Sequence, residues 1–318
     1  MFSKNDILLT PKNKLYFGIQ NILNEAALSR CEQTSFVWTQ SPHSLCLALN
    51  KKYFEIASAN QNILGIIAPP QAVVASKNKT KFGLILAQKA DELFYYIHNQ
   101  GVHLENFKAT KQENNLLEKK SVYIAPTANV DPTTILGNNV WIDDNVVIHP
   151  GCIILDHSII KRNSVLHPHV TVGTEGFFSK YIMGKKQHIK HYGGVEIGEN
   201  CILHTGTNIS RSVNFQEKTI ISDNVHIGIQ TNIGHDCRVG ADSDISAKVL
   251  LAGRVNVGKK CWIGAGVTIS NALEIGDQAR IMIGATVISN VPEHSTVSGN
   301  FARDHKKNLK QYLRSERQ

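Results

Sequence analysis

Residues 221–263 read ISDNVHIGIQTNIGHDCRVGADSDISAKVLLAGRVNVGKKCWI, and every sixth residue in this stretch is a branched aliphatic. The same spacing runs from Ile124 to Val172 and again from Ile197 to Val287, and every position on it is apolar. A six-residue unit makes one short strand and one turn, and three such units close one triangular coil whose aliphatic side chains point inward. The spacing therefore predicts a mainly β fold built as a parallel β-helix.

The register of the repeat breaks once. Val172 and Ile197 are separated by one residue more than four hexads, so we expect the intervening segment to leave the coil as an external loop. Loops of this length in a compact repeat usually carry function. The predicted divisions are a small α/β domain (1–110), a polar linker (111–121), the β-helix (122–298) with its external loop (173–194), and a basic C-terminal helix (299–318).

The first domain shows no hexads. Short apolar runs at Ile63–Ile67 and Ala72–Ser76 predict strands, and the apolar spacing over Leu84–Asn99 predicts an amphipathic helix. A small domain of mixed α and β structure accounts for this pattern.

Composition excludes several classes of protein. The 318 residues are 42% apolar and 19% charged, which rules out a disordered tail and a disulfide-stapled mini-protein. No stretch approaches the roughly 18 apolar residues of a membrane helix, and no signal-peptide core is found, so we expect a cytoplasmic protein with at most peripheral membrane contact. The six cysteines form no Cys-x-x-Cys pair and are interpreted as reduced, buried apolar residues.

The net charge of +8 calls for anionic partners. The tail from Phe301 contributes six basic and two acidic residues, or +4 of that total. The basic residues are not interleaved with aromatic ones in any nucleic-acid-binding module, so we expect no nucleic acid partner.

His235 is the candidate general base. It follows core position Ile233 by two residues and should point outward at a corner of the coil. Histidine is the side chain with an unperturbed pKa near neutrality, which a base that accepts a proton from a nucleophile needs. Eighteen residues later, at the same corner of the next coil, Gly253 leaves room for a substrate and offers a backbone N–H to an oxyanion. His226 is the rival candidate.

The hexads resemble the left-handed β-helix acyltransferases, which work as homotrimers on thioesters of coenzyme A or acyl carrier protein. The order of the predicted parts is similar to that of the UDP-3-O-(3-hydroxyacyl)glucosamine N-acyltransferases of lipid A synthesis. The stretches that carry this resemblance are Thr34-Ser35-Phe36-Val37, Gly173-Thr174-Glu175-Gly176-Phe177 and Gln230-Thr231-Asn232-Ile233-Gly234-His235-Asp236.

The resemblance implies site residues. His235 falls on the family's catalytic histidine, Gly253 on its oxyanion glycine and Phe36 on the aromatic that stacks on uracil. Thr39 and Pro42 stand where the family's uracil site has an asparagine and a tyrosine.

On the donor side, Ala272 stands where the family has a second histidine, and the neighbouring Asn271 is the polar candidate for donor binding. The close of the repeat, Gly299 to Arg303, resembles the end of coenzyme-A-dependent sugar acetyltransferases, and it implies that Arg303 lies near the donor's phosphates.

The loop supplies further candidates. Phe177, His188 and His191 are expected to contact substrate. The two histidines have the spacing of metal ligands, but their place in an ejected loop favours substrate contact, and we expect no metal.

The resemblance implies transfer of a 3-hydroxyacyl group from acyl carrier protein to the amine of a UDP-amino sugar. The phosphopantetheine thioester would be a co-substrate, with no permanently bound cofactor. An acetyl-coenzyme A-dependent N-acetyltransferase acting on a nucleotide-activated amino sugar stays open as the alternative. The contrasting class is a non-enzymatic β-helix that serves as a scaffold or binds metal.

Overall fold

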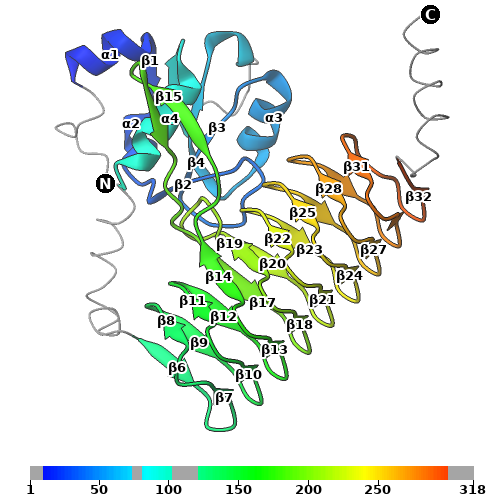
Figure 1. Cartoon of the computed structure of the whole chain (residues 1–318). Coiled ribbons are helices and arrows are strands. Elements are labelled where there is room, and N and C mark those ends of the chain that lie inside the picture. Colours follow the sequence, from blue (N-terminus) through cyan, green and yellow to red (C-terminus); the bar gives the residue numbers. More distant parts are fainter. Residues whose placement is uncertain (1–9, 74–80, 102–120, 300–318) are drawn as a thin grey trace, which may run out of the picture.

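The computed structural model describes residues 10–73, 81–101 and 121–299. Between residues 121 and 299 the chain forms three parallel sheets that make the sides of a β-helix (Figure 1). The β6 sheet holds β6 Val122–Ile124, β9 Val140–Ile142, β12 Ser158–Ile160, β17 Gly194–Ile197, β20 Lys218–Ile221, β23 Arg238–Val239, β26 Asn256–Val257 and β29 Glu274–Ile275. The β7 sheet holds β7 Asn129–Val130, β10 Val147–Ile148, β13 Val165–Leu166, β18 Ile202–Leu203, β21 His226–Ile227, β24 Asp244–Ile245, β27 Trp262–Ile263, β30 Arg280–Ile281 and β32 Thr296–Val297. The β8 sheet holds β8 Ile135–Leu136, β11 Ile153–Ile154, β14 Thr171–Thr174, β19 Asn208–Ser210, β22 Asn232–Ile233, β25 Leu250–Leu251, β28 Thr268–Ile269 and β31 Thr286–Val287.

The predicted aliphatics form the core of this helix. In the β6 sheet each one pairs in parallel register with the aliphatic of the next coil, so that one buried column runs along the sheet. Its members are Ile142, Ile160, Ile197, Ile221, Val239, Val257 and Ile275, none more than 2% exposed. Burial of each such side chain contributes roughly 1.5–3 kcal/mol. The parallel β-helix predicted from the hexads is confirmed.

The corners of the coils share one backbone conformation. A residue with positive φ recurs every six positions over long stretches, as at Asp236, Asp242, Lys248, Arg254 and Lys260. This left-handed conformation turns the chain sharply, and Asn and Asp adopt it more readily than most other residues. The side chains at these corners therefore face outward, where a site can be built.

The hexad count is wrong at one position. Phe215 falls on the period of six, but it lies outside the ladder and is only partly buried. The reason is a second insertion: Ile197 pairs with Ile221, which is 24 residues later instead of 18, so one hexad's length leaves the coil between β19 and β20. The loop predicted at 173–194 is present, although β14 ends at Thr174 and β17 begins at Gly194. It carries the hairpin of β15 Ser179–Ile182 and β16 Lys185–His188.

The described part of the first domain has a five-stranded sheet in the order β1-β5-β4-β3-β2, with only β1 antiparallel. Its elements are α1 Pro11–Phe17, β1 Ile19–Leu23, α2 Glu25–Leu28, β2 Gln33–Ser35, β3 Ser44–Leu47, α3 Lys51–Ala59, β4 Ile63–Ala68, the 3-10 helix η1 Pro70–Ala72, β5 Gly83–Ala87 and α4 Ala90–Asn99. The strand predicted at 63–67 is confirmed by β4. The helix predicted at 84–99 is correct only from Ala90, because residues 84–87 belong to β5.

Three other predicted elements differ from the described structure or lie outside it. Ala72 ends η1 instead of starting a strand, and residues 74–76 lie outside the described residues. Most of the predicted linker and nearly all of the predicted C-terminal helix, including Arg303, also lie outside them.

The two insertions attach the first domain to the β-helix. The hairpin β15–β16 packs along α4, as Figure 1 shows. Ile182 and Ile189 of the loop and Val213 of the second insertion are buried in one apolar cluster with Leu93 and Ile97 of α4. His98 completes the joint, since its Nδ1 lies 2.7 Å from Thr34 Oγ1 and its Nε2 lies 2.8 Å from the carbonyl oxygen of Lys190.

Truncation of Ile221 to alanine should cost about 2–5 kcal/mol of stability, because it empties a column position that is fully buried between coils. Phe215→Ala should cost clearly less, since that ring lies outside the ladder. Chemical denaturation of both variants measures the difference. An equal loss at the two positions would contradict the shifted register.

The joint at His98 should weaken in acid. Burial lowers the pKa of His98 from 6.5 to about 4, so below pH 6.5 the unfolded chain binds a proton that the folded chain does not. Stability contributed by the neutral ring is therefore lost as the pH falls from about 6.5 toward 4, by up to roughly 3 kcal/mol. His98→Gln should make the pH dependence of the thermal midpoint shallower over this range. A variant with the wild-type slope would show that another group titrates.

Candidate active site

The candidate site lies at one corner of the β-helix, where the β8 sheet passes into the β6 sheet. His235 lies between β22 and β23 at this corner, and Gly253 and Asn271 follow at the same corner of the next two coils. Both insertions leave the coil at this corner too, because each connects a β8-sheet strand to a β6-sheet strand. The β-helix thus brings the histidine, the glycine and the two loops to one edge.

His235 is buried and oriented by a carboxylate. Its Nδ1 lies 2.7 Å from Oδ2 of Asp236, and the whole residue is 7% exposed. A carboxylate only accepts hydrogen bonds, so Nδ1 carries the proton and donates it to Asp236. Nε2 is then the basic nitrogen. It lies against Gly253, where a Cβ atom would collide with it.

Asp236 is held by the second insertion and by the coil. Its Oδ1 accepts hydrogen bonds from the Ser212 hydroxyl and, at 3.1 Å, from the Val213 N–H. Its own N–H donates to Thr219 Oγ1 at 2.9 Å. A buried carboxylate is costly unless its lone pairs are used, and these donors supply that compensation. The pair can therefore keep one geometry while Nε2 works.

The hairpin loop forms the wall beside the imidazole. The Phe178 ring stacks on His235 with centroids 5.6 Å apart, and the His191 ring meets it edge-on at 5.1 Å. Gly176 passes so close that a side chain there would press on both histidines. Burial, followed by the neighbouring His235, lowers the pKa of His191 to about 4, so His191 is neutral near pH 7.

Two hollows adjoin the site, between the first domain and the β-helix. Each has a volume of about 250–260 Å³, and both are lined by Phe36, Trp38 and Arg254. The rings of Phe36 and Trp38 stack at 5.3 Å, and Trp38 is 54% exposed. The Arg254 guanidinium lies 5.9 Å from the centre of the Phe36 ring. The hollows thus present an aromatic surface beside a cation.

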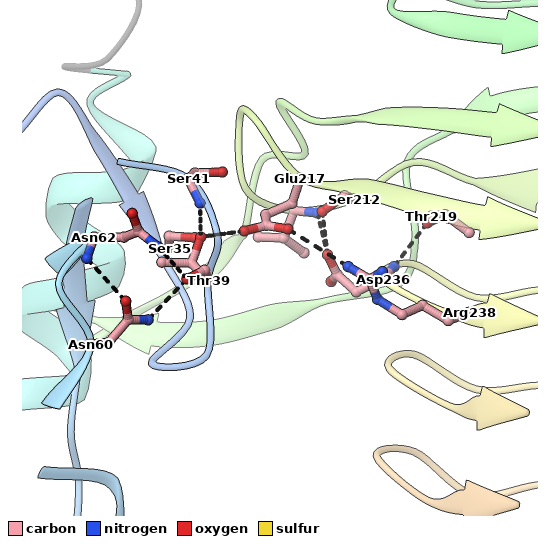
Figure 2. A network of polar contacts seen from close by, with 11 residues as sticks. Ser35, Thr39, Ser41, Asn60, Asn62, Ser212, Glu217, Thr219, Asp236 and Arg238 are labelled. Atoms are coloured by element: carbon pink, nitrogen blue, oxygen red, sulfur yellow. Dashed lines mark hydrogen bonds and ion pairs between the residues drawn. The ribbon is translucent and has the colours of Figure 1, made fainter. Parts of the chain in front are cut away.

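Polar contacts tie the first domain to the second insertion (Figure 2). Glu217 of the second insertion accepts hydrogen bonds from Ser35 at 3.1 Å and Thr39 at 2.5 Å, and its other oxygen lies 4.0 Å from Arg238. Thr39 is therefore buried in the joint between the domains, although the sequence comparison had placed it at the position of a base-contacting asparagine.

Two family models match the chain. Residues 118–221 match the GMPPB C-terminal domain, and residues 230–271 match the hexapeptide repeat of succinyl-transferase. Both matched segments lie in the β-helix, and the second is a hexapeptide-repeat model. The mainly β coil of parallel sheets is a left-handed β-helix of hexapeptide repeats.

The chain is similar to several acyltransferases. An acyl-[acyl-carrier-protein]–UDP-N-acetylglucosamine O-acyltransferase of Bartonella bacilliformis is 33% identical over 32% of this chain and 39% of its own length. The bifunctional protein GlmU of Buchnera aphidicola is 27% identical over 57% of this chain and 50% of its own. The chain thus spans half or less of the length of these relatives. A solved UDP-N-acetylglucosamine acyltransferase of Campylobacter jejuni is 23% identical, covers 60% of this chain and 82% of its own, and has a TM-score of 0.44.

The structure brings together most of the predicted loop and base residues. His235, Gly253 and His191 meet at one point, and His188 stacks on His191 with ring centroids 5.6 Å apart. Phe177 does not join them: it is 93% exposed, and its neighbour Phe178 is the ring on His235.

The remaining candidates lie farther out. Asn271 shares the corner two coils on and is exposed. The rival His226 lies in the β7 sheet, on another side of the coil, where it is exposed and 3.8 Å from Asp244. Arg303 lies outside the described residues.

Sequence reasoning did not assign a role to Asp236, Phe178 or Arg254. Asp236 follows His235 directly, and only its positive φ of 60° lets its carboxylate turn back to the imidazole. Side chains of adjacent residues seldom form a hydrogen bond with each other, so the sequence His235-Asp236 alone gave little indication that the carboxylate would orient the imidazole. Phe178 and Arg254 take their places only through the loop and the next coil.

The other expectations concern the chain as a whole. All six cysteines are free and buried, and burial raises the pKa of Cys31 to about 12, which suits inert apolar packing. Among the residues that the structure describes, no helix is long and apolar enough to span a bilayer.

Proposed function

We propose that the protein transfers an acyl group from a thioester of acyl carrier protein to the amine of a UDP-linked amino sugar, with His235 as the general base. The observation that carries the proposal is the His235–Asp236 pair, whose Nε2 faces Gly253 at an open corner. The named relatives support acyl transfer to a UDP sugar. The order of the domain, the β-helix and the loop supports the amine as the acceptor.

The proposed chemistry starts with proton removal. Nε2 of His235 takes a proton from the acceptor amine as its nitrogen attacks the thioester carbonyl, and the Asp236 carboxylate stabilises the imidazolium that forms. Within the described residues the Gly253 N–H donates to no protein acceptor, so it is available to the tetrahedral oxyanion. Collapse of the intermediate breaks the C–S bond, and the imidazolium returns its proton to the leaving thiolate.

The nucleotide would bind in the hollows beside Phe36. A pyrimidine base can stack on an exposed aromatic face, and the Phe36–Trp38 pair offers one. Arg254 lies near the Phe36 ring and near the Phe178 ring that covers His235, which supports a contact with the diphosphate. Thr39 is buried between the domains and cannot contact the base. The stacked rings of Phe36 and Trp38 would therefore bind the uracil in place of the family's asparagine and tyrosine.

The protein is proposed to act as a homotrimer, with the phosphopantetheine arm lying in the groove between subunits past Asn271. The exposed position of Asn271 at the corner of the site supports a polar contact with that arm. An acetyl-coenzyme A donor is the second candidate. Ala272, which offers no second histidine at that level, is the observation that favours it.

His235→Ala should lower kcat at least ~100-fold, because the base is lost. Asp236→Asn should also lower it, by no more than loss of the base does, since an amide in place of the carboxylate no longer fixes the Nδ1 tautomer. Steady-state kinetics with the acyl thioester measures both effects, and unchanged thermal midpoints exclude unfolding. His226→Ala is the matched control and should keep the wild-type rate; near-full activity of His235→Ala would refute the assignment of the base.

One set of assays can identify both the acyl donor and the acceptor atom. Purified protein is incubated with 3-hydroxyacyl-acyl carrier protein or acetyl-coenzyme A and with a UDP sugar that has either a free amine or only hydroxyl groups. Alkaline hydroxylamine cleaves oxygen esters and leaves amides intact. We expect a hydroxylamine-resistant product from the acyl carrier protein donor and the amine. Product from acetyl-coenzyme A alone would select the second candidate, and a cleavable product would make the enzyme an O-acyltransferase.

A further inference from the structure

A cluster of Glu175, His188 and His191 joins the two ends of the hairpin loop. Glu175 precedes β15, His188 ends β16, and His191 follows three residues later. Nε2 of His188 lies 2.8 Å from Oε2 of Glu175, and one ligand atom from each of the three residues lies within 4.8 Å of the others. The donor set is two imidazoles and one carboxylate.

His191 is the member whose environment is incomplete. The residue is 2% exposed, yet neither of its ring nitrogens has a hydrogen-bond partner among the described residues. A buried polar group without a partner costs about 1–3 kcal/mol. One ring nitrogen of His191 lies within 4.8 Å of a ligand atom of His188 and of Glu175, so a cation held among the three would give it a partner.

We propose that Glu175, His188 and His191 bind one divalent transition-metal ion of the zinc class. Two histidines and one glutamate are a recurrent zinc ligand set, and imidazole ligands disfavour Mg²⁺ and Ca²⁺. The side chains of His188 and Glu175 are 47% and 49% exposed, which leaves an entry path and an open fourth position for water. The six cysteines cannot compete for the ion, because all are buried.

The ion would close the base of the loop that carries Phe178. His191 also touches the His235 ring, so fixing His191 fixes one wall of the site. A metal ion bound at this cluster would therefore hold the loop in place beside His235. Its binding can be tested without any substrate, so the outcome does not depend on the proposed acyl transfer.

The experiment titrates the full chain, freed of metal by a chelator, with Co²⁺ and follows visible d–d absorption. We expect one Co²⁺ per chain with the intensity of a tetrahedral site, no thiolate charge-transfer band, and displacement by one equivalent of Zn²⁺. Changing a residue that only supports a ligand lowers affinity 10–100-fold, so Glu175→Gln and His188→Ala should each lower it by at least ~100-fold.

Glu32→Gln is the matched control, because Glu32 forms an exposed pair with His43 at 3.0 Å without a second histidine in the cluster. It should bind Co²⁺ like the wild type. As a second readout, Zn²⁺ should slow amide hydrogen exchange across 175–191 in the wild type and in Glu32→Gln only. Absence of stoichiometric binding in the wild type, or equal binding and protection in Glu175→Gln and His188→Ala, would overturn the proposal.

Discussion

The stacking of aliphatic side chains from coil to coil is the constraint on which the rest of this structure depends. Each inward residue must meet its neighbour in the next coil, so every insertion has to leave at a corner and return in register. The pairing of Ile160 with Ile197 and of Ile197 with Ile221 shows that both insertions obey this rule. Because both leave at the corner of His235, the demands of the core gather the loops around one histidine.

This arrangement also explains the stability of the buried His235–Asp236 pair. Neither side chain could be buried at a bare corner of the coil without a large desolvation cost. The second insertion brings Ser212 and Val213 as donors to Asp236, and the hairpin brings Phe178 as a cover for His235. The same insertions attach the first domain, which carries Phe36. The base and the proposed nucleotide surface are thus positioned by the same short segments.

The sequence predicted the parts that follow from the period of six. The coil, the corner of His235 and the neighbour Gly253 come from counting residues. Counting hexads gave the wrong result at Phe215. The insertion there is one hexad long, so the spacing of six continues in the sequence although Phe215 is not part of the ladder of paired strands. Counting also could not show that Phe178 instead of Phe177 faces the base, because neighbouring residues in a loop have no fixed face. The role of Asp236 depends on a backbone angle that residue types only hint at.

A crystal structure of the protein with a non-hydrolysable acyl-phosphopantetheine thioester analogue tests the central claim most directly. We expect the carbonyl oxygen of the analogue to lie within hydrogen-bond distance of the Gly253 N–H, and Nε2 of His235 to face the carbonyl carbon from the side of the Phe36 hollows. Density for the analogue at another corner of the coil, with Nε2 facing only protein, would contradict the claim.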